Sequence, residues 1–370
     1  MSIHFAESEL ADRRKAAAAE LARRGLDGLL MFRQESMYYL TGYDTFGYVF
    51  FQCLYMGADD ETLTLLTRTP DLRQARHTSI VSDIRLWYDA EGVNPAEDLR
   101  EILEEHGCRG KRLGIETDAY GLTGYNLKRV EAALEGFCEL VEASDLVTRL
   151  RAVKSEAEIS YVREAARLAD LGLDRAVEVT EPGAFEGDVL AAVQGAIFAG
   201  GGDFPANEVI IGSGPRALLF RYAAGMRRMD PVDQLSLEWA GSYRHYHAAM
   251  MRTLCVGEAS DYQRRLFSAG REAQEEMTEA LAPGRPRRRG RRRPQARAGR
   301  RRARGTPLRG VRVLFGHHLQ PELDGLADAV LGELRPRGAG DGLLLALHSH
   351  GLGSRGSHEP GADLPGDRDG

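Results

Sequence analysis

The sequence predicts an α+β protein in which an α/β domain is followed by a second domain built from helices and a β-hairpin. Over residues 1–145, short apolar segments alternate with helix-forming segments, as in a sheet covered by helices. Ser155 followed by Glu158 forms a capping box, which marks the start of a long helix. Residues 233–253 alternate with period two around a short turn, which is typical of a hairpin.

The first domain opens with residues 7–25, which are rich in Ala and Leu and end at a glycine that favours a helix cap. Leu26–Phe32 is apolar throughout and predicts a buried strand. The aromatic segment SMYYLTGYDTFGYVFFQCLYM follows, with turns expected at Gly42 and Gly47. The remaining expected elements are strands at Leu63–Leu66, Arg112–Glu116 and Glu139–Ala143, and helices at Ala96–Gly107 and Tyr125–Leu134.

The second domain is predicted to begin at residue 146. Its first helix, from Ser155, is expected to bury an apolar stripe of Ile159, Val162, Ala166, Ala169 and Leu173. The other expected elements are a helix at Glu186–Ala199, a turn at Gly200–Gly202, a strand opening at Glu208–Ile211 and a helix at Asp261–Leu281.

The predicted hairpin carries the densest chemistry in the chain. A Gly-Ser-Tyr turn is expected after LSLEWA, and the second strand is expected to begin at His245. The carboxylate of Glu238 would then lie opposite a strand with two imidazoles, those of His245 and His247, which suits proton transfer. Two structural alternatives stay open: a packed polar core around the histidines, and an ion pair of Glu238 with Arg244 or Arg252.

Cellular location is predicted from what the sequence lacks. No apolar run reaches membrane-span length, and the first residues lack the apolar core of a signal peptide. The four cysteines are scattered without a CxxC pair, which favours reduced thiols over a disulfide framework or zinc ligands. We therefore expect a cytoplasmic protein with no membrane partner.

The end of the chain differs from the rest. Residues 286–370 contain 17 Arg, no Lys and 9 Asp or Glu, so they carry +8 while the first 285 residues carry −14. A disordered tail and a nucleic-acid arm are two interpretations, but no aromatic residues interleave with the arginines for base stacking. A third is a frameshift, because Arg, Gly, Ala and Pro runs are what a GC-rich gene yields when it is read one base out. From residue 310 onward, the shifted codons permit GYSLGTTFNPNWMDWPM, and we favour this interpretation.

Several segments resemble the creatinase and aminopeptidase P, or pita-bread, superfamily. RLRAVKSEAEISYVREAARLAD resembles its linker and first helix, SMYYLTGYDTFGY its N-terminal domain, and LSLEWAGSYRHYHAAMMRT its first metal-ligand hairpin. With IIGSGPRALLFRY and the out-of-frame segment, these resemble the ectoine hydrolase branch. The resemblance implies a creatinase-like α/β domain over 1–145 and the first part of a pita-bread catalytic domain over 146–285, truncated by an aberrant, poorly ordered tail over 286–370.

The resemblance also bears on metal binding. Metal-dependent members carry two Asp on this hairpin, at the positions of Glu238 and Ala249 here, and a histidine at the position of Arg221, before Tyr222. In the shifted frame, a metal-binding His becomes Tyr and a metal-binding Glu becomes His. Divalent cations need several carboxylates, so we expect no metal and no cofactor.

The implied substrate is ectoine, a cyclic amidine with a carboxylate, opened by water to an acetylated 2,4-diaminobutyrate. Glu238 is expected to act as base or nucleophile and His247 as a proton shuttle, while Arg221, Tyr222 and His245 bind the substrate. For Arg221 a plain surface position is the alternative. A homodimer is also implied, with the aromatic segment 38–51 near the partner's site; for most of those residues an aromatic core under the sheet is the alternative. No nucleic-acid partner is expected. A creatinase-like or other metal-free C–N hydrolase, an inactive chain and a nucleic-acid binder are the alternatives.

Overall fold

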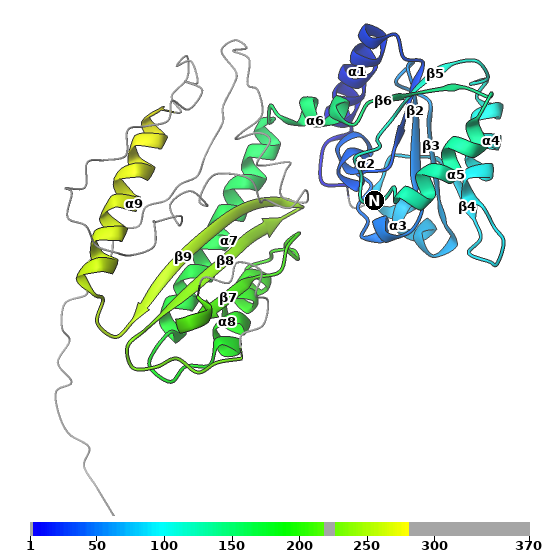
Figure 1. Ribbon diagram of the computed structural model, residues 1–370. Helices are drawn as coiled ribbons and strands as arrows, with labels where there is room; N and C mark the ends of the chain where they lie inside the picture. Colours follow the sequence, from blue (N-terminus) through cyan, green and yellow to red (C-terminus); the bar gives the residue numbers. More distant parts are fainter. Residues whose placement is uncertain (1–2, 218–225, 281–370) are drawn as a thin grey trace, which may run out of the picture.

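The computed structural model describes residues 3–217 and 226–280. These residues form two units joined by the short helix α6 (Asp145–Arg151) (Figure 1). The N-terminal unit is a six-stranded sheet between helices, and the second unit is a three-stranded sheet packed on helices. The predictions for Arg221, Tyr222 and residues 286–370 lie outside the described residues.

Six strands form the N-terminal sheet in the order β4-β3-β2-β1-β5-β6. The pairs β1–β2 and β2–β3 are antiparallel, whereas β3–β4, β1–β5 and β5–β6 are parallel. A short turn suffices between β2 and β3, while each parallel neighbour is reached through helical crossovers. The strands are β1 (Gly28–Met31), β2 (Cys53–Gly57), β3 (Leu63–Arg68), β4 (Asp83–Trp87), β5 (Arg112–Ile115) and β6 (Glu139–Glu142).

Helices contribute to two separate apolar clusters of this unit. The first includes residues of α1 (Glu7–Arg24), α2 (Gln34–Thr41), α3 (Leu72–Thr78) and α6. The second includes residues of α4 (Pro95–Glu105) and α5 (Gly124–Leu134). Both clusters also contain side chains of the central strands, so helices cover both faces of the sheet. This arrangement confirms the predicted α/β domain.

The predicted elements of this unit lie within two residues of the observed ones, and Gly25 caps α1 with φ of 65°. The helices α2 and α3 and the strands β2 and β4 were not predicted. The aromatic segment contains both α2 and β2, with the 3₁₀ turn η1 (Gly47–Val49) between them; Gly42 ends α2, as expected of a turn residue. Every residue of β2 is buried, so no alternation marked it as a strand.

The second unit begins with α7 (Glu156–Val179), which has the predicted capping box of Ser155 and Glu158. Helix α7 packs on α8 (Glu186–Ala199) and against two of the three antiparallel strands, which lie in the order β7-β8-β9 (Figure 1). The strands are β7 (Ile210–Ser213), β8 (Asp233–Tyr243) and β9 (Tyr246–Val256), the 3₁₀ turn η3 (Gly214–Arg216) follows β7, and α9 (Asp261–Ala280) follows β9. A second 3₁₀ turn, η2 (Thr69–Asp71), precedes α3 in the first unit.

The buried face of α7 differs from the predicted stripe, of which only Ala169 is fully buried. The buried residues of α7 are Glu158, Ala165, Leu168, Ala169, Gly172 and Ala176. Small residues face the sheet because the two backbones approach closely: a Cβ built on Gly241 of β8 would lie 2.0 Å from the Ala165 carbonyl oxygen. The prediction selected larger apolar residues and was wrong about the rotation of the helix.

The hairpin turn also lies elsewhere than predicted. Gly241, Ser242 and Tyr243 belong to β8, and the two-residue turn is Arg244–His245, with φ of 49° and 66°. Two successive positive φ values match the twist of hairpin strands. The twist therefore places the turn at Arg244–His245, and not at the Gly-Ser pair that the sequence favoured. His245 therefore lies in the turn and not on the strand face on which it was expected.

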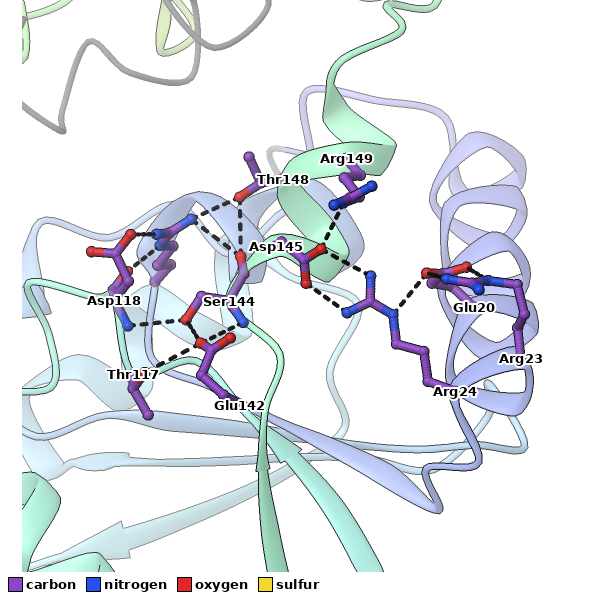
Figure 2. Close-up of polar contacts among 11 residues, drawn as sticks. Glu20, Arg23, Arg24, Thr117, Asp118, Glu142, Ser144, Asp145, Thr148 and Arg149 are labelled. Atoms are coloured by element: carbon purple, nitrogen blue, oxygen red, sulfur yellow. Dashed lines mark hydrogen bonds and ion pairs between the residues drawn. The ribbon is translucent and has the colours of Figure 1, made fainter. Parts of the chain in front are cut away.

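Polar contacts hold α6 against the first unit (Figure 2). Arg24 of α1 donates to both carboxylate oxygens of Asp145, at 2.5 and 3.2 Å. The Thr148 hydroxyl donates to the Ser144 carbonyl and accepts from Arg33 at 2.7 Å. Each of these partly exposed contacts contributes little alone, but together they fix the segment that leads into α7. Within the described ranges, none of the helices combines the length and apolar character of a membrane span.

Candidate functional site

One face of the β8–β9 hairpin carries the predicted catalytic residues. The register places Glu238 opposite Met251, Ala240 opposite Ala249, and Ser242 opposite His247. Directly opposed residues share a face, and so do residues two apart on one strand. Glu238 and His247 are therefore on the same face of the hairpin, as predicted.

The opposite face anchors the hairpin to the helices. Leu235, Leu237 and Trp239 are buried in the apolar cluster of this unit. The Trp239 indole donates from Nε1 to the Ala169 carbonyl of α7 at 3.1 Å. Because side chains alternate along a strand, this anchoring directs Glu238, which is half-buried, away from α7.

The two arginines considered as ion-pair partners of Glu238 lie elsewhere. Arg252 is directly opposite Leu237 and so projects from the other face. Arg244, in the turn, donates to the Tyr161 hydroxyl at 2.5 Å. The geometry thus favours neither of these two ion pairs.

His247 is buried and both of its ring nitrogens have backbone partners. Nδ1 lies 2.9 Å from the His245 carbonyl, and Nε2 lies 2.9 Å from the Ala206 amide. The carbonyl needs a donor and the amide needs an acceptor, so the ring is neutral with its proton on Nδ1. Burial lowers the pKa of His247, which agrees with this tautomer. The contacts match the packed polar core that was the alternative for this residue, and its shuttle role stays a prediction.

His245 contacts the N-terminal unit. Its Nε2 lies 2.9 Å from Asp44 Oδ1. Burial lowers the pKa of His245, but the hydrogen bond and charge of Asp44, with further charge from Asp203 and Glu35, outweigh it, and the pKa is raised above 6.5. The side chain is 45% exposed. The substrate-binding role of His245 stays a prediction.

A buried carboxylate in this unit was not predicted. Glu186, at the start of α8, accepts hydrogen bonds from the Ser213 amide at 2.7 Å and its hydroxyl at 2.6 Å. Its other oxygen accepts from the Arg227 amide at 3.2 Å, and Arg227 forms an ion pair with Asp233. The sequence signal was an acidic residue at the start of a mostly apolar helix. The cluster joins α8 to the two residues that flank the sequence segment 214–226.

The described residues do not form a metal site. Across residues 3–217 and 226–280, no three His, Cys, Asp or Glu side chains gather in a way that could hold a metal ion. On the hairpin, the two positions for which the resemblance implies metal-binding aspartates hold Glu238 and Ala249, so one oxygen donor side chain is present and the other is a methyl group. Divalent cations take several oxygen ligands, and this donor set alone does not fit one.

Comparisons with known proteins assign the family. The model of the creatinase/prolidase N-terminal domain matches residues 13–153, and that of metallopeptidase family M24 matches residues 160–326, which extends beyond residue 285. An uncharacterized hydrolase/peptidase of Sinorhizobium fredii is 30% identical over 292 residues, covering 76% of this chain and 74% of that protein. The chain belongs to metallopeptidase family M24, with a creatinase-like N-terminal domain and a pita-bread domain.

Relatives within the family differ in named activity. The ectoine hydrolase of Halomonas elongata is 27% identical over 304 residues, covering 77% of this chain and 75% of that protein. The Xaa-Pro dipeptidase of Pyrococcus horikoshii is 26% identical over 265 residues, covering 71% and 69%. The solved prolidase of Thermococcus sibiricus superposes with a TM-score of 0.66 at 22% identity, covering 74% of this chain and 72% of that one, which supports the fold.

Proposed function

We propose that this M24 hydrolase opens the ring of ectoine without a metal ion, with Glu238 as the reacting carboxylate. The observation that carries the proposal is the pairing on the hairpin, which puts Ala249 on the face of Glu238, at the position for which the resemblance implies a second aspartate. One carboxylate at these two positions, in place of two, suits general-base or nucleophilic catalysis better than cation binding. The similarity to the Halomonas ectoine hydrolase supports the substrate.

The reaction adds water to the amidine carbon of ectoine and breaks one of its two ring C–N bonds. The carbon becomes the carbonyl of an acetamide, the released nitrogen takes a proton, and the product is an N-acetyl-2,4-diaminobutyrate. As a base, Glu238 would take a proton from the attacking water; as a nucleophile, it would bond to the carbon before water replaces it. Before either step, its charge would pair with the amidinium.

Other residues would have supporting roles. Arg221 would bind the substrate carboxylate in a bidentate fashion beside Tyr222, and His245 would line the substrate's approach. His247 would shuttle the proton only after releasing one of its two backbone contacts.

Two other C–N hydrolases compete with this assignment. A peptidase acting on Xaa-Pro dipeptides is favoured by the similarity to the Pyrococcus enzyme, which is nearly as great as that to the ectoine hydrolase. A creatinase-like amidino hydrolase would use the same Glu238 carboxylate. Incubating the purified protein with ectoine, an Xaa-Pro dipeptide and creatine, with and without a chelator, separates the three.

The decisive variant is Glu238→Gln, which removes the negative charge and keeps the size. We expect loss of ectoine turnover by at least about a hundredfold, with activity of the parent protein resistant to chelator. The matched control is Glu258→Gln, whose side chain is 89% exposed beyond the end of the same hairpin. Full activity of the Glu238 variant, or restoration of a chelated protein by divalent metal, would contradict the proposal.

We also propose that the residues after 285 are translated from a shifted reading frame. Three apolar side chains in the described part are exposed: Met251 at 41%, Leu266 at 41% and Phe267 at 65%. Their exposure supports the loss of a segment that would otherwise bury them. Against it, the M24 match continues to residue 326. Resequencing the gene across codons 283–290 tests the frameshift, and an intact frame excludes it. Salt-dependent RNA binding that disappears on deletion of residues 286–370 would instead favour a nucleic-acid arm.

A cytoplasmic homodimer completes the proposal. Phe46, Val49 and Phe50 are 82%, 62% and 40% exposed in and beside η1 of the N-terminal unit. Adjacent exposed apolar side chains mark interaction surfaces, and this one suits a second copy of the chain. Sedimentation should give a dimer that Phe46→Ser weakens, and a monomeric parent protein would refute it. Cell fractionation checks the location.

A further inference from the structure

The hairpin turn of the second unit contacts the N-terminal unit of the same chain. In Figure 1, the turn between β8 and β9 points towards that unit. Asp44, just after α2, accepts from His245 Nε2 at 2.9 Å, and the Tyr38 hydroxyl donates to the Arg244 carbonyl at 3.2 Å. Two residues of the first unit therefore hold both residues of the turn, Arg244 and His245.

Further hydrogen bonds connect His245 to other residues of the second unit. The His245 carbonyl accepts from His247 Nδ1, and His247 Nε2 accepts from the Ala206 amide. The Asp203 carboxylate accepts from the His245 amide at 3.2 Å, and the Asp203 amide donates to the Ser242 carbonyl at 2.9 Å. The segment 203–209 is thereby held by the turn, and it leads directly into β7.

Strand β7 borders the reacting residue, because Ile210 is directly opposite Glu238. We propose that Asp44 is a positioning residue, which acts from the N-terminal domain through His245 to hold His247 and the segment 203–209, which leads into the strand beside Glu238. The contacts stand without any assumed activity, and their consequence for catalysis rests on the proposed function of Glu238.

The charges around the turn favour an ion pair. Asp44, Asp203 and Glu35 raise the pKa of His245 against the effect of burial, and the hydrogen bond from His245 lowers the pKa of Asp44. The positive charge of Arg244 and the imidazole of His4 lie close by, and burial lowers the pKa of His4, which keeps that ring neutral near pH 7. The pair is fully charged between the usual pKa values of Asp and His, and it weakens as the pH rises through the raised pKa of His245.

The side chain of Asp44 can be removed without releasing its backbone. The Asp44 amide donates to the Thr78 hydroxyl at 3.1 Å, and its carbonyl accepts from Gln74 Nε2 at 2.8 Å. Asp44→Ala therefore removes the hydrogen bond to His245 and the nearby negative charge, and leaves these backbone contacts in place. His245→Asn deletes the same contact from the other side, and asparagine tolerates the positive φ of this position.

Hydrogen–deuterium exchange of the full-length chain tests the proposal. In Asp44→Ala we expect about fivefold faster exchange in residues 203–209 and 243–248 at pH 6, with the sheet of the N-terminal unit unchanged. His245→Asn should give the same increase, and the double variant no more than either single one. The control is Asp12→Asn, because the Asp12 side chain is 80% exposed.

Unchanged exchange in residues 203–209 in both variants would overturn the proposal, and so would additive effects in the double variant. A second experiment measures kcat and KM for ectoine. Asp44→Ala should lower kcat, and Asp44→Asn should shift the pH profile of kcat. A parent chain that does not turn over ectoine would refute the proposed function but leave the exchange result intact.

Discussion

Glu116 at the end of β5 accepts a hydrogen bond from the Ser36 hydroxyl of α2 at 2.5 Å. Its other oxygen accepts from the backbone amides of Phe32 and Arg33, at 3.1 and 3.0 Å. Arg33, the N-cap residue of α2, has no side-chain cap hydrogen bond, and the Glu116 carboxylate satisfies its backbone amide. The same helix carries Tyr38, which contacts the hairpin turn.

Glu116→Gln is predicted to stabilise the protein at high pH. Burial raises the pKa of Glu116 to about 7, against the opposing hydrogen bonds from Ser36, Arg33 and Phe32. Because this value exceeds that of the unfolded chain, the folded state holds the proton between pH 4.5 and 7, and stability falls as the pH rises through that range. Glutamine can accept from both amides and donate to the Ser36 hydroxyl, which can rotate.

Thermal unfolding measures this effect. The melting temperature of Glu116→Gln relative to the parent protein should rise from pH 5 to pH 8, by the equivalent of about 1–3 kcal/mol. Glu135→Gln, on the exposed surface, should show no such trend. A difference that is constant with pH would show that Glu116 keeps an ordinary pKa.

Glu186→Gln is predicted to destabilise the folded protein. Glu186 is also fully buried, but its two oxygens face Ser213 on one side and the Arg227 amide on the other. A glutamine that accepts from Ser213 must turn its NH₂ towards the Arg227 amide, and two donors then face each other. We expect a loss of roughly 1–3 kcal/mol by urea unfolding, and unchanged stability would refute this geometry.

Gly241→Ala is predicted to damage the packing of α7 on β8. A Cβ at this position would lie 2.0 Å from the Ala165 carbonyl oxygen and 2.5 Å from the Ala169 amide. Backbone atoms cannot move aside as a flexible side chain can, so the helix must shift, at a cost of about 3 kcal/mol or more. Gly195→Ala in α8 is the control, because nothing lies within 4 Å of its Cβ, and it should stabilise by up to about 1 kcal/mol.

Tyr246→Phe is predicted to loosen the base of the hairpin turn. The Tyr246 hydroxyl donates to Glu158 Oε1 at 2.8 Å, and the Glu158 side chain is 3% exposed. Leaving a buried carboxylate oxygen without this donor should cost roughly 1.5–3 kcal/mol in chemical unfolding. Tyr125→Phe, at a residue that is 71% exposed, should stay within about 0.5 kcal/mol of the parent protein. Equal effects at the two positions would contradict the prediction.

Features set by a few adjacent residues were predictable from the sequence. The capping box of Ser155, the cap at Gly25 and the alternation around Glu238 depend on near neighbours in the chain. The shared face of Glu238, His247 and Ala249 follows from that alternation. These local patterns therefore determined most helices, several strands and the candidate site of this protein.

Tertiary structure decided what depends on contacts between distant segments. Asp44 and His245 are 201 residues apart, and no local pattern relates them. The face that α7 buries is set by how closely β8 approaches, and the hairpin turn by strand twist, which outweighs the Gly-Ser signal. The partners of Glu116 and Glu186 arise in the same way, because a buried carboxylate takes its donors from whichever segments the packing brings to it.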